Sequence, residues 1–415
     1  MTYSYQATRK ACYLGSIIQA ITVNVPPVFF VIFQEDYGIS YAQLGTLILL
    51  TFVVQIVVDF VLAKVAHRFH PRRLLQTAAL LALIGYALMA ATPVLFSAHT
   101  FVGLLAAVLV YSAGSGFLEV MTSPVVNALP SEDKGASMAF LHSFYCWGQL
   151  GAVLLTTLLL QLVGHRHWQW ILVFWMLFPA VNFYLMSRVP MPPMESGASA
   201  VGKAGGGMRR LMSLPLFWVA FMIMASAGAS ELAMSQWASL FAQKGLGLSK
   251  TLGDLAGPCF FALLMGLGRM IYGIQGDRLK MNRALMLSAI LCIVSYLLTA
   301  LSPWPLLSLL GCGLCGLSVA IMWPGTLVMA SRAIPGGGTM LFALMALGGD
   351  VGCSLGPWLT GMVSDHLQTS ALAAAMPLSP DQLALRGGLL CAIIFPALLL
   401  FFTPILTKKK GERHE

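Results

Sequence analysis

Charged side chains are scarce in this chain. Lys, Arg, Asp and Glu together make up 9% of its 415 residues, whereas hydrophobic side chains make up 58%. A soluble globular protein carries about 25% charged residues, so the scarcity excludes that class and indicates a membrane protein that crosses the bilayer several times. The net charge of +9 does not indicate nucleic-acid binding, because most of the basic residues lie in short loops between apolar runs, where they set orientation.

Sequence signals of catalysis and of metal binding are also missing. There is no Gly-Lys-Ser or Gly-Lys-Thr phosphate loop, which argues against an ATP-driven pump. No His–Glu zinc pattern and no nucleophile elbow occur, so we expect no enzyme activity, no cofactor and no bound metal. The eight cysteines lie within or at the edges of apolar runs, and Cys312 and Cys315 have redox spacing without polar neighbours, so no disulfide framework is expected.

Long apolar runs dominate what is present. A membrane-spanning helix needs about 20 mostly apolar residues, and the chain holds twelve such runs in two sets of six. They fall at 11–34, 43–66, 74–95, 101–129, 136–163, 167–187, 214–243, 251–275, 282–301, 305–333, 339–364 and 384–406. The stretch from Val189 to Gly207 is rich in Pro, Gly and Ser and is typical of a flexible connector. The sequence therefore predicts an all-α membrane protein with twelve transmembrane helices in two pseudo-symmetric six-helix bundles, 1–188 and 212–415, joined by a cytoplasmic linker at 189–211.

The basic residues are unevenly divided between the loops. If both termini are cytoplasmic, 19 of the 24 Lys and Arg residues lie on the cytoplasmic side and four on the other, with Arg269 inside a helix. Cytoplasmic loops of membrane proteins are enriched in Lys and Arg. We therefore expect a multi-pass protein of the cell (inner) membrane with both termini in the cytoplasm.

The two halves of the chain resemble each other. Pro124 lies opposite Pro324 at a shift of 200 residues, and Gln149 lies opposite Asp350 at a shift of 201. Parallel halves of six helices with a transport pathway between them are an established transporter plan. The repeat favours a transporter.

The loop after the eighth run carries a more specific pattern. Gly273-x-x-x-Asp277-Arg278, followed by Arg283, resembles the loop motif of the major facilitator superfamily. The resemblance implies a transporter fold and a latch, in which the Asp–Arg set makes charge-assisted bonds across the cytoplasmic ends of helices. The first-half copy has His67 at the acidic position, so we assign the gating role to the second-half residues Gly273, Asp277, Arg278 and Arg283.

A narrower resemblance lies in the fourth and seventh runs. Residues 116–119 (GFLE) with Ser123-Pro124, and residues 228–231 (GASE), are similar to segments of the fucose-permease-like sugar:proton symporters. This resemblance implies symport of a sugar with protons. The chain departs from that branch in two places, because Asn24 and the prolines after it replace its first-helix aspartate and Ser123 replaces its asparagine.

Four acidic side chains lie away from the ends of their apolar runs: Asp59, Glu119, Glu231 and Asp350. An ionisable group in hydrocarbon is costly and is a functional-site hypothesis by default. We predict proton coupling through Glu119, Glu231 and Asp350, with Glu119 as the leading candidate, because a buried carboxyl can take up and release a proton. The alternative for each is a structural carboxyl that is hydrogen-bonded to a neighbouring helix. Asp59 lies nearer the cytoplasmic end, and we expect it to form a gating or structural pair with Lys64 or Arg269.

Polar and aromatic side chains recur at helical spacing near these acids. His142, Tyr145 and Gln149 share one helix face at i, i+3 and i+7. Amides supply directed hydrogen bonds and flat rings can pack on the apolar faces of a sugar, while plain helix packing is the alternative reading for each aromatic residue. The predicted solute-binding residues are Asn24, His142, Tyr145, Gln149, Gln236, Trp237 and Trp323.

These observations predict a secondary active transporter that works by alternating access. The leading hypothesis is symport of a small polar solute, foremost a sugar, with protons, and sodium is the alternative coupling ion. The alternative function is a proton-coupled exporter of amphiphilic or cationic compounds. We expect the partners to be a small-molecule substrate and the lipid bilayer, without nucleic acid, and we expect a monomer, because this architecture needs no second copy to form its pathway.

Overall fold

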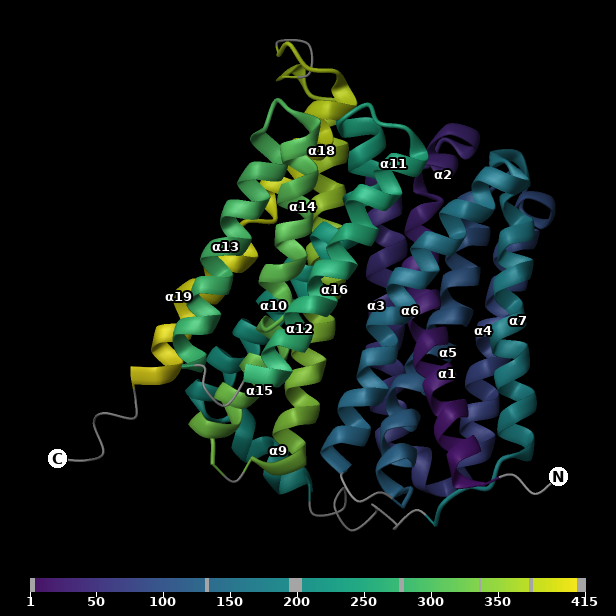
Figure 1. The fold of residues 1–415 in the computed structure, drawn as a ribbon, viewed down its shortest axis with the longest axis vertical. Coiled ribbons are helices and arrows are strands. Elements are labelled where there is room, and N and C mark those ends of the chain that lie inside the picture. Colours follow the sequence, from purple (N-terminus) through teal and green to yellow (C-terminus); the bar gives the residue numbers. More distant parts are fainter. Residues whose placement is uncertain are drawn as a thin grey trace. The chain divides into compact units, whose positions relative to one another are not determined.

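The computed structural model of the protein describes residues 4–130, 134–193, 204–275, 280–335, 337–372 and 376–408. These residues form helices joined by short turns, without a β-strand among them (Figure 1). Twelve helical stretches are long and apolar enough to cross a membrane, and the predicted fold class is confirmed. The spans are Tyr5–Val28, Tyr41–Leu62, Pro71–Leu95, Thr100–Ala128, Phe140–Val163, His165–Arg188, Pro215–Gly245, Lys250–Tyr272, Met281–Leu301, Pro305–Ala333, Met340–Gln368 and Pro380–Leu406.

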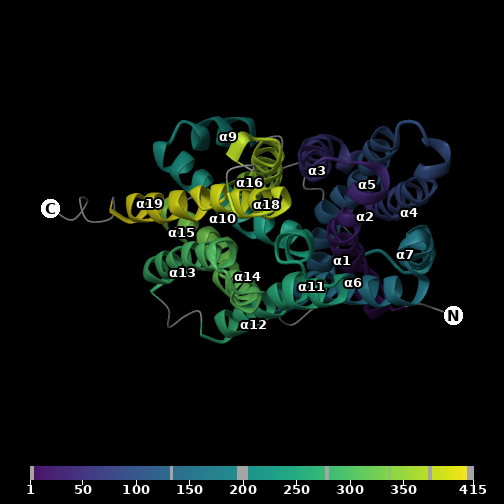
Figure 2. The same ribbon diagram turned by 90° about the horizontal axis from the view of Figure 1, so that it is seen from above.

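The chain divides into two compact units. Unit 1 covers residues 1–39 and 50–202, and unit 2 covers residues 40–49 and 203–415. The helices of each unit run side by side, as the view along them in Figure 2 shows. Unit 1 contains α1 (Tyr5–Val28), α2 (Phe30–Tyr37), most of α3 (Tyr41–Val65), η1 (Ala66–Arg68), α4 (Pro71–Leu95), α5 (Thr100–Ala128), α6 (Lys134–Val163), η2 (His165–His167) and α7 (Trp168–Arg188).

Unit 2 contains the first turns of α3 and all later elements. Its helices are α9 (Ala204–Met212), α10 (Pro215–Leu240), η3 (Phe241–Gly245), α11 (Lys250–Asp254), η4 (Leu255–Cys259), α12 (Phe260–Gln275), α13 (Met281–Leu301), α14 (Pro305–Val319), α15 (Met322–Ala333), α16 (Gly338–Gln368), α18 (Pro380–Cys391) and α19 (Ile394–Lys408).

Local sequence signals mark several helix ends. Four helices each begin with a proline: α4, α10, α14 and α18. Proline suits the first turn of a helix because it lacks an N–H, and the N–H of another residue would have no partner there. At the start of α18, the Gln382 N–H donates to the Ser379 hydroxyl and the Ser379 N–H donates back to the Gln382 side chain, which satisfies two free backbone donors. α2 ends at Gly38, whose φ of 64° lies in the left-handed region that favours glycine.

The first predicted run, 11–34, is divided in the structure. α1 passes through Pro26 and Pro27 and ends at Val28, and α2 begins at Phe30. Proline lacks an N–H and clashes with the carbonyl four residues earlier, so the hydrogen-bond ladder is interrupted, and the Phe29 N–H donates to the Pro26 carbonyl at 3.0 Å.

Two segments of unit 2 are π-helical, which the sequence did not predict. η3 (Phe241–Gly245) follows α10, and η4 (Leu255–Cys259) lies between α11 and α12. A π segment is rare and is found most often at functional sites. Pro258 lies inside η4, where its missing N–H favours irregular helix geometry.

The stretch predicted as a flexible connector is anchored at both described ends. Thr8 donates to the Pro190 carbonyl at 2.6 Å, and Arg72 donates to the carbonyls of Ser187 and Val189. On the other side α9 is helical, although its first residues belong to the stretch predicted as a flexible connector. The Trp218 indole N–H donates to the carbonyl of Met212, the last residue of α9, at 2.8 Å.

Close helix contacts depend on glycine in both units. In unit 1 a side chain at Gly85 of α4 would lie 2.6 Å from the Tyr111 Cβ of α5. In unit 2 a side chain at Gly352 of α16 would overlap the carbonyl of Ala225 in α10. Small residues let the backbones of membrane helices approach closely, so these positions fix the α4–α5 and α10–α16 contacts.

Candidate functional site

Glu119 of α5 lies inside the apolar body of unit 1. It is half-buried, and its carboxylate is hydrogen-bonded by the side chain of Gln19 from α1. Gln19 was not among the predicted site residues. An amide can donate to an ionised carboxylate and accept from a protonated one, so this contact is compatible with either state of Glu119.

Asp59 of α3 is the second acid of this region. It lies close enough to Glu119 for their charges to interact, and its Oδ1 atom is buried without a hydrogen-bond partner among the described residues. The side chain of Lys64, one of its two expected partners, lies outside the described residues, and the other, Arg269, contacts a different acid. Two neighbouring carboxylates repel each other when both are ionised.

Three predicted residues of unit 1 lie on α6, and they differ in burial. Gln149 is buried, with 4% of its surface exposed, Tyr145 is half-buried and His142 is exposed. On α1, Asn24 is buried, and its amide donates to the Ala20 carbonyl of the same helix at 2.9 Å. That bond occupies one donor of Asn24 and leaves its carbonyl oxygen as the acceptor.

Glu231 of α10 and Arg269 of α12 form an ion pair in unit 2. The Nη2 atom of Arg269 lies 3.3 Å from the Oε2 atom of Glu231, and the two side chains are 30% and 12% exposed. Both residues were predicted to be functional, but not as partners. The positive charge of Arg269 favours the ionised form of the Glu231 carboxyl.

Asp350 and Trp323 lie near each other in the same unit. Asp350 of α16 is buried, and the half-buried Trp323 of α15 packs its ring directly on the neighbouring residue Gly349. A side chain at Gly349 would displace the indole. The glycine therefore permits the ring of Trp323 to pack on α16 at the residue that precedes the acid.

Gln236 and Trp237 are buried in α10. The indole N–H of Trp237 donates to the Pro357 carbonyl of α16 at 3.0 Å, and its ring lies 6.1 Å from that of Tyr41 at the start of α3. In this state Trp237 is part of the packing between α10 and α16.

The predicted latch is only partly described. Gly273 belongs to the last turn of α12, whereas Asp277 and Arg278 lie outside the described residues. Arg283, in the first turn of α13, is exposed. The gating role of these four residues stays a prediction.

One polar cluster of unit 2 was missed by the sequence reasoning. It consists of Ser239 of α10, Gln243 of η3, and Lys250 and Asp254 of α11. Lys250 is one of the four basic residues that the charge distribution places in loops on the non-cytoplasmic side, and Asp254 is not among the predicted site residues. The available signal was the spacing of the two charges at i and i+4, which places them on one helix face.

The sequence model of the Major Facilitator Superfamily matches residues 12–357 of this chain. The chain belongs to the major facilitator superfamily. No curated protein matches it.

Solved structures of this superfamily share the fold over almost the whole chain. A D-xylose–proton symporter matches with a TM-score of 0.76 and 14% identity, covering 97% of each chain. A bacterial homolog of the human lysosomal transporter Spinster, inward-facing and occupied, matches with a TM-score of 0.75, 14% identity and 97% coverage of each chain. The E. coli fucose:proton symporter FucP matches with a TM-score of 0.64 and 16% identity, covering 98% of this chain and 100% of FucP. At identities this low, the structural matches show a shared fold.

Proposed function

We propose that this major facilitator protein moves a small polar solute across the membrane by alternating access, coupled to protons, and that the solute is a sugar. The observation that carries the proposal is the pairing of Glu119 with Gln19. A carboxyl held by a neutral amide can change its protonation state without leaving a charge of opposite sign unpaired. That property is what a proton-carrying residue of a symporter needs.

Glu231 and Asp350 have different parts in the proposal. Protonating Glu231 would leave the Arg269 guanidinium without its counter-charge, so we assign the ion pair to solute contact, where it offers donors and acceptors together. Asp350 is the second candidate for proton binding, because it is buried and a buried carboxyl can take up and release a proton.

The solute-binding assignment rests on chemistry that suits hydroxyl groups. Asn24, Gln149 and Gln236 supply buried amides, and Tyr145 and Trp323 supply half-buried rings. His142 and Trp237 complete the proposed set, Trp237 only after local movement of α10 against α16. A sugar presents hydroxyls for the amides and apolar faces for the rings.

Orientation and assembly follow from the same reasoning. We propose that the protein lies in the cell (inner) membrane with both termini in the cytoplasm, because most Lys and Arg residues then lie on the cytoplasmic side. We also propose that it acts as a monomer, with gating at Asp59 and at the loop residues Gly273, Asp277, Arg278 and Arg283.

The decisive experiment is transport by the purified protein in liposomes under an imposed pH gradient. The solutes to compare are radiolabelled hexoses, pentoses and lipophilic cations, and a sodium gradient without a pH gradient is the parallel arm. We expect accumulation of a sugar driven by the pH gradient and unchanged by sodium. Export of lipophilic cations without any sugar response would establish the multidrug-type alternative, and a sodium-driven flux that ignores pH would overturn the proton assignment.

A further inference from the structure

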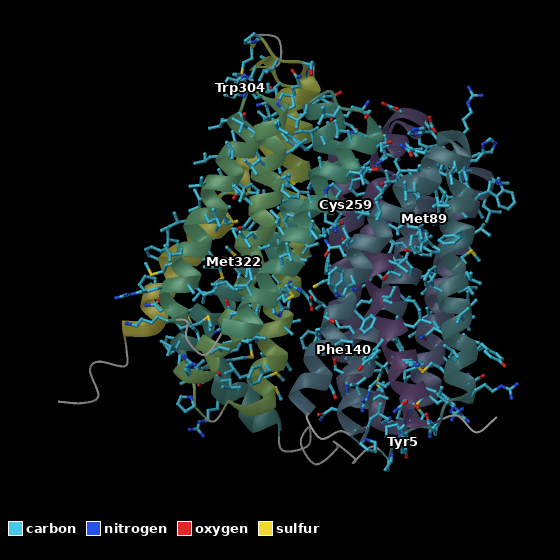
Figure 3. All side chains as sticks on the ribbon, viewed as in Figure 1. Tyr5, Met89, Phe140, Cys259, Trp304 and Met322 are labelled. Atoms are coloured by element: carbon cyan, nitrogen blue, oxygen red, sulfur yellow. The ribbon has the colours of Figure 1, made fainter. Side chains whose placement is uncertain are left out.

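The polar cluster formed by Ser239, Gln243, Lys250 and Asp254 is built around one ammonium group. The Nζ atom of Lys250 lies 2.9 Å from Oδ1 and 2.8 Å from Oδ2 of Asp254, and 3.1 Å from the Ser239 hydroxyl. The cluster closes the turn that joins α10 to α11, and Cys259 in Figure 3 marks the end of the η4 segment that follows it.

Lys250, Asp254 and Ser239 are shielded from solvent, and Gln243 is half-buried. The Lys250 side chain is 10% exposed and that of Asp254 is 0% exposed, and Ser239 is buried. Removing a carboxylate and an ammonium from water is expensive unless each is paired and hydrogen-bonded. The cluster satisfies this condition with charge-assisted bonds at short distances.

The Ser239 hydroxyl is fully used. It donates to the Asp254 carboxylate and accepts from both Lys250 and the Gln243 amide. A hydroxyl has one donor and two acceptor positions, so all of its hydrogen-bonding capacity is directed at the other three members. Gln243 also donates to the Ser239 carbonyl at 3.1 Å, which fixes the side-chain orientation.

We infer that Asp254 and Ser239 form a binding site for a small monovalent cation and that the ammonium of Lys250 is its resident cation. The two carboxylate oxygens of Asp254 and the hydroxyl oxygen of Ser239 all contact the position of the Lys250 Nζ atom. Together these three oxygen atoms carry one net negative charge, and Gln243 and burial hold them rigid. Hard oxygen ligands of this kind suit small cations. Lys250 reaches the point from the same helix face as Asp254, so the site is filled as soon as the helix forms.

The occupancy by a tethered cation has a consequence for ion selectivity. A free sodium or potassium ion cannot enter while the ammonium is present, because the charge of Asp254 is already balanced. The proposal does not depend on the transport function, and its test uses no transport measurement.

The test is cation-dependent thermal unfolding of the purified full chain. Lys250→Ala removes the resident cation and leaves the oxygen atoms and a cavity. We expect about 100 mM ammonium, potassium or sodium chloride to raise its thermal midpoint by about 3 °C or more over the same ionic strength of N-methyl-D-glucamine chloride, whose cation is too bulky to enter. The unaltered protein should respond equally to all four salts.

Two controls separate the site from general salt effects. The double variant Lys250→Ala/Asp254→Asn should lose the cation-specific rise, because the negative charge is gone. Lys280→Ala, which removes an exposed lysine at the start of α13, should respond like the unaltered protein. Equal responses of Lys250→Ala to all four salts would overturn the proposal.

The proposal remains testable if Lys250→Ala does not survive purification. The unaltered protein and Asp254→Asn then suffice. Small cations should not stabilise the unaltered protein specifically, because the Lys250 ammonium fills the site, and they should not stabilise Asp254→Asn, because its site has lost the negative charge. A rise with small cations in the unaltered protein that disappears in Asp254→Asn would show that the site is open, and this result would contradict the role of Lys250.

Discussion

Each unit holds a glutamate inside an apolar span, but the two glutamates have partners of opposite character. Glu119 in unit 1 is bonded by the neutral amide of Gln19, and Glu231 in unit 2 is paired with the guanidinium of Arg269. A neutral partner leaves the protonation state open, whereas a cationic partner favours the ionised form. Burial of an acid therefore does not by itself assign proton carriage, and the partner on the neighbouring helix decides between the two roles.

The largest expected effect is that of Glu119→Gln on transport. The variant keeps the shape and a hydrogen bond to Gln19 but cannot exchange a proton, so accumulation driven by the pH gradient should fall to the level reached without a gradient. Solute exchange at equal pH should persist. Liposome uptake measures both, and Asp36→Asn, an exposed acid of the same unit, is the matched control. Full gradient-driven accumulation in Glu119→Gln would contradict the different roles proposed for Glu119 and Glu231.

The next largest effect is expected from breaking the ion pair of Glu231 and Arg269 in unit 2. This change should lower the free energy of unfolding. Glu231→Gln leaves the Arg269 charge in a poorly solvated place, and we expect a loss of about 2–3 kcal/mol, below the ~3–5 kcal/mol of a fully buried pair because Arg269 is partly exposed. Arg269→Gln should cost a similar amount. The double variant should lose less than the sum of the two single changes, as a double-mutant cycle of thermal unfolding would measure. Additive losses would mean that the two charges do not interact.

Close helix packing should be equally sensitive in both units. Gly352→Ala in unit 2 and Gly85→Ala in unit 1 each place a methyl group against a neighbouring helix, and overpacking of this kind destabilises by about 1–3 kcal/mol. Gly266→Ala and Gly151→Ala are the matched controls, because nothing lies within 4 Å of the added atom. Lower thermal midpoints in the first pair only would confirm the packing; equal midpoints in all four would contradict it.

The smallest expected effects concern single neutral hydrogen bonds. Tyr296→Phe in unit 2 removes the bond to the Ser230 carbonyl, and Ser115→Ala in unit 1 removes the bond from the Gln55 amide, each of 2.8 Å and buried. Each change leaves one polar group without its partner and should lower stability by about 1–2 kcal/mol. Thermal unfolding of both variants measures the two losses of stability. Equal losses would mean that the neutral hydrogen bonds contribute alike in the two units, which then differ only in their charged contacts.

The fold class was predictable from the sequence because the length and apolar character of each run exceed what other folds allow. The position of Glu119 and Glu231 inside their spans was predictable for the same reason. Their partners were not, since the rotation of a membrane helix is set by packing that the apolar pattern does not resolve. Arg269, which was named with Lys64 as a possible partner of Asp59, lies beside Glu231.

The Lys250–Asp254 pair escaped prediction for a different reason. Charges at the start of an apolar run are usually solvated, so the sequence predicts a loop position for Lys250. The π-helical segments η3 and η4 flank α11, whose Lys250 and Asp254 contact Ser239 of α10. A π-helical segment has no reliable sequence signature apart from Pro258.

The η4 segment also sets the helical phase of everything that follows it. Each residue of an α-helix advances the direction of the side chain by about 100°, and a π turn accommodates roughly one residue more than an α turn. Arg269 lies further along the same helix and faces Glu231 with that extra residue in place. Deleting one residue from Leu255–Cys259 would restore α geometry and turn the guanidinium by about 100° away from its partner. The ion pair of unit 2 is thus encoded as much by the spacing along the chain as by the two residues that form it.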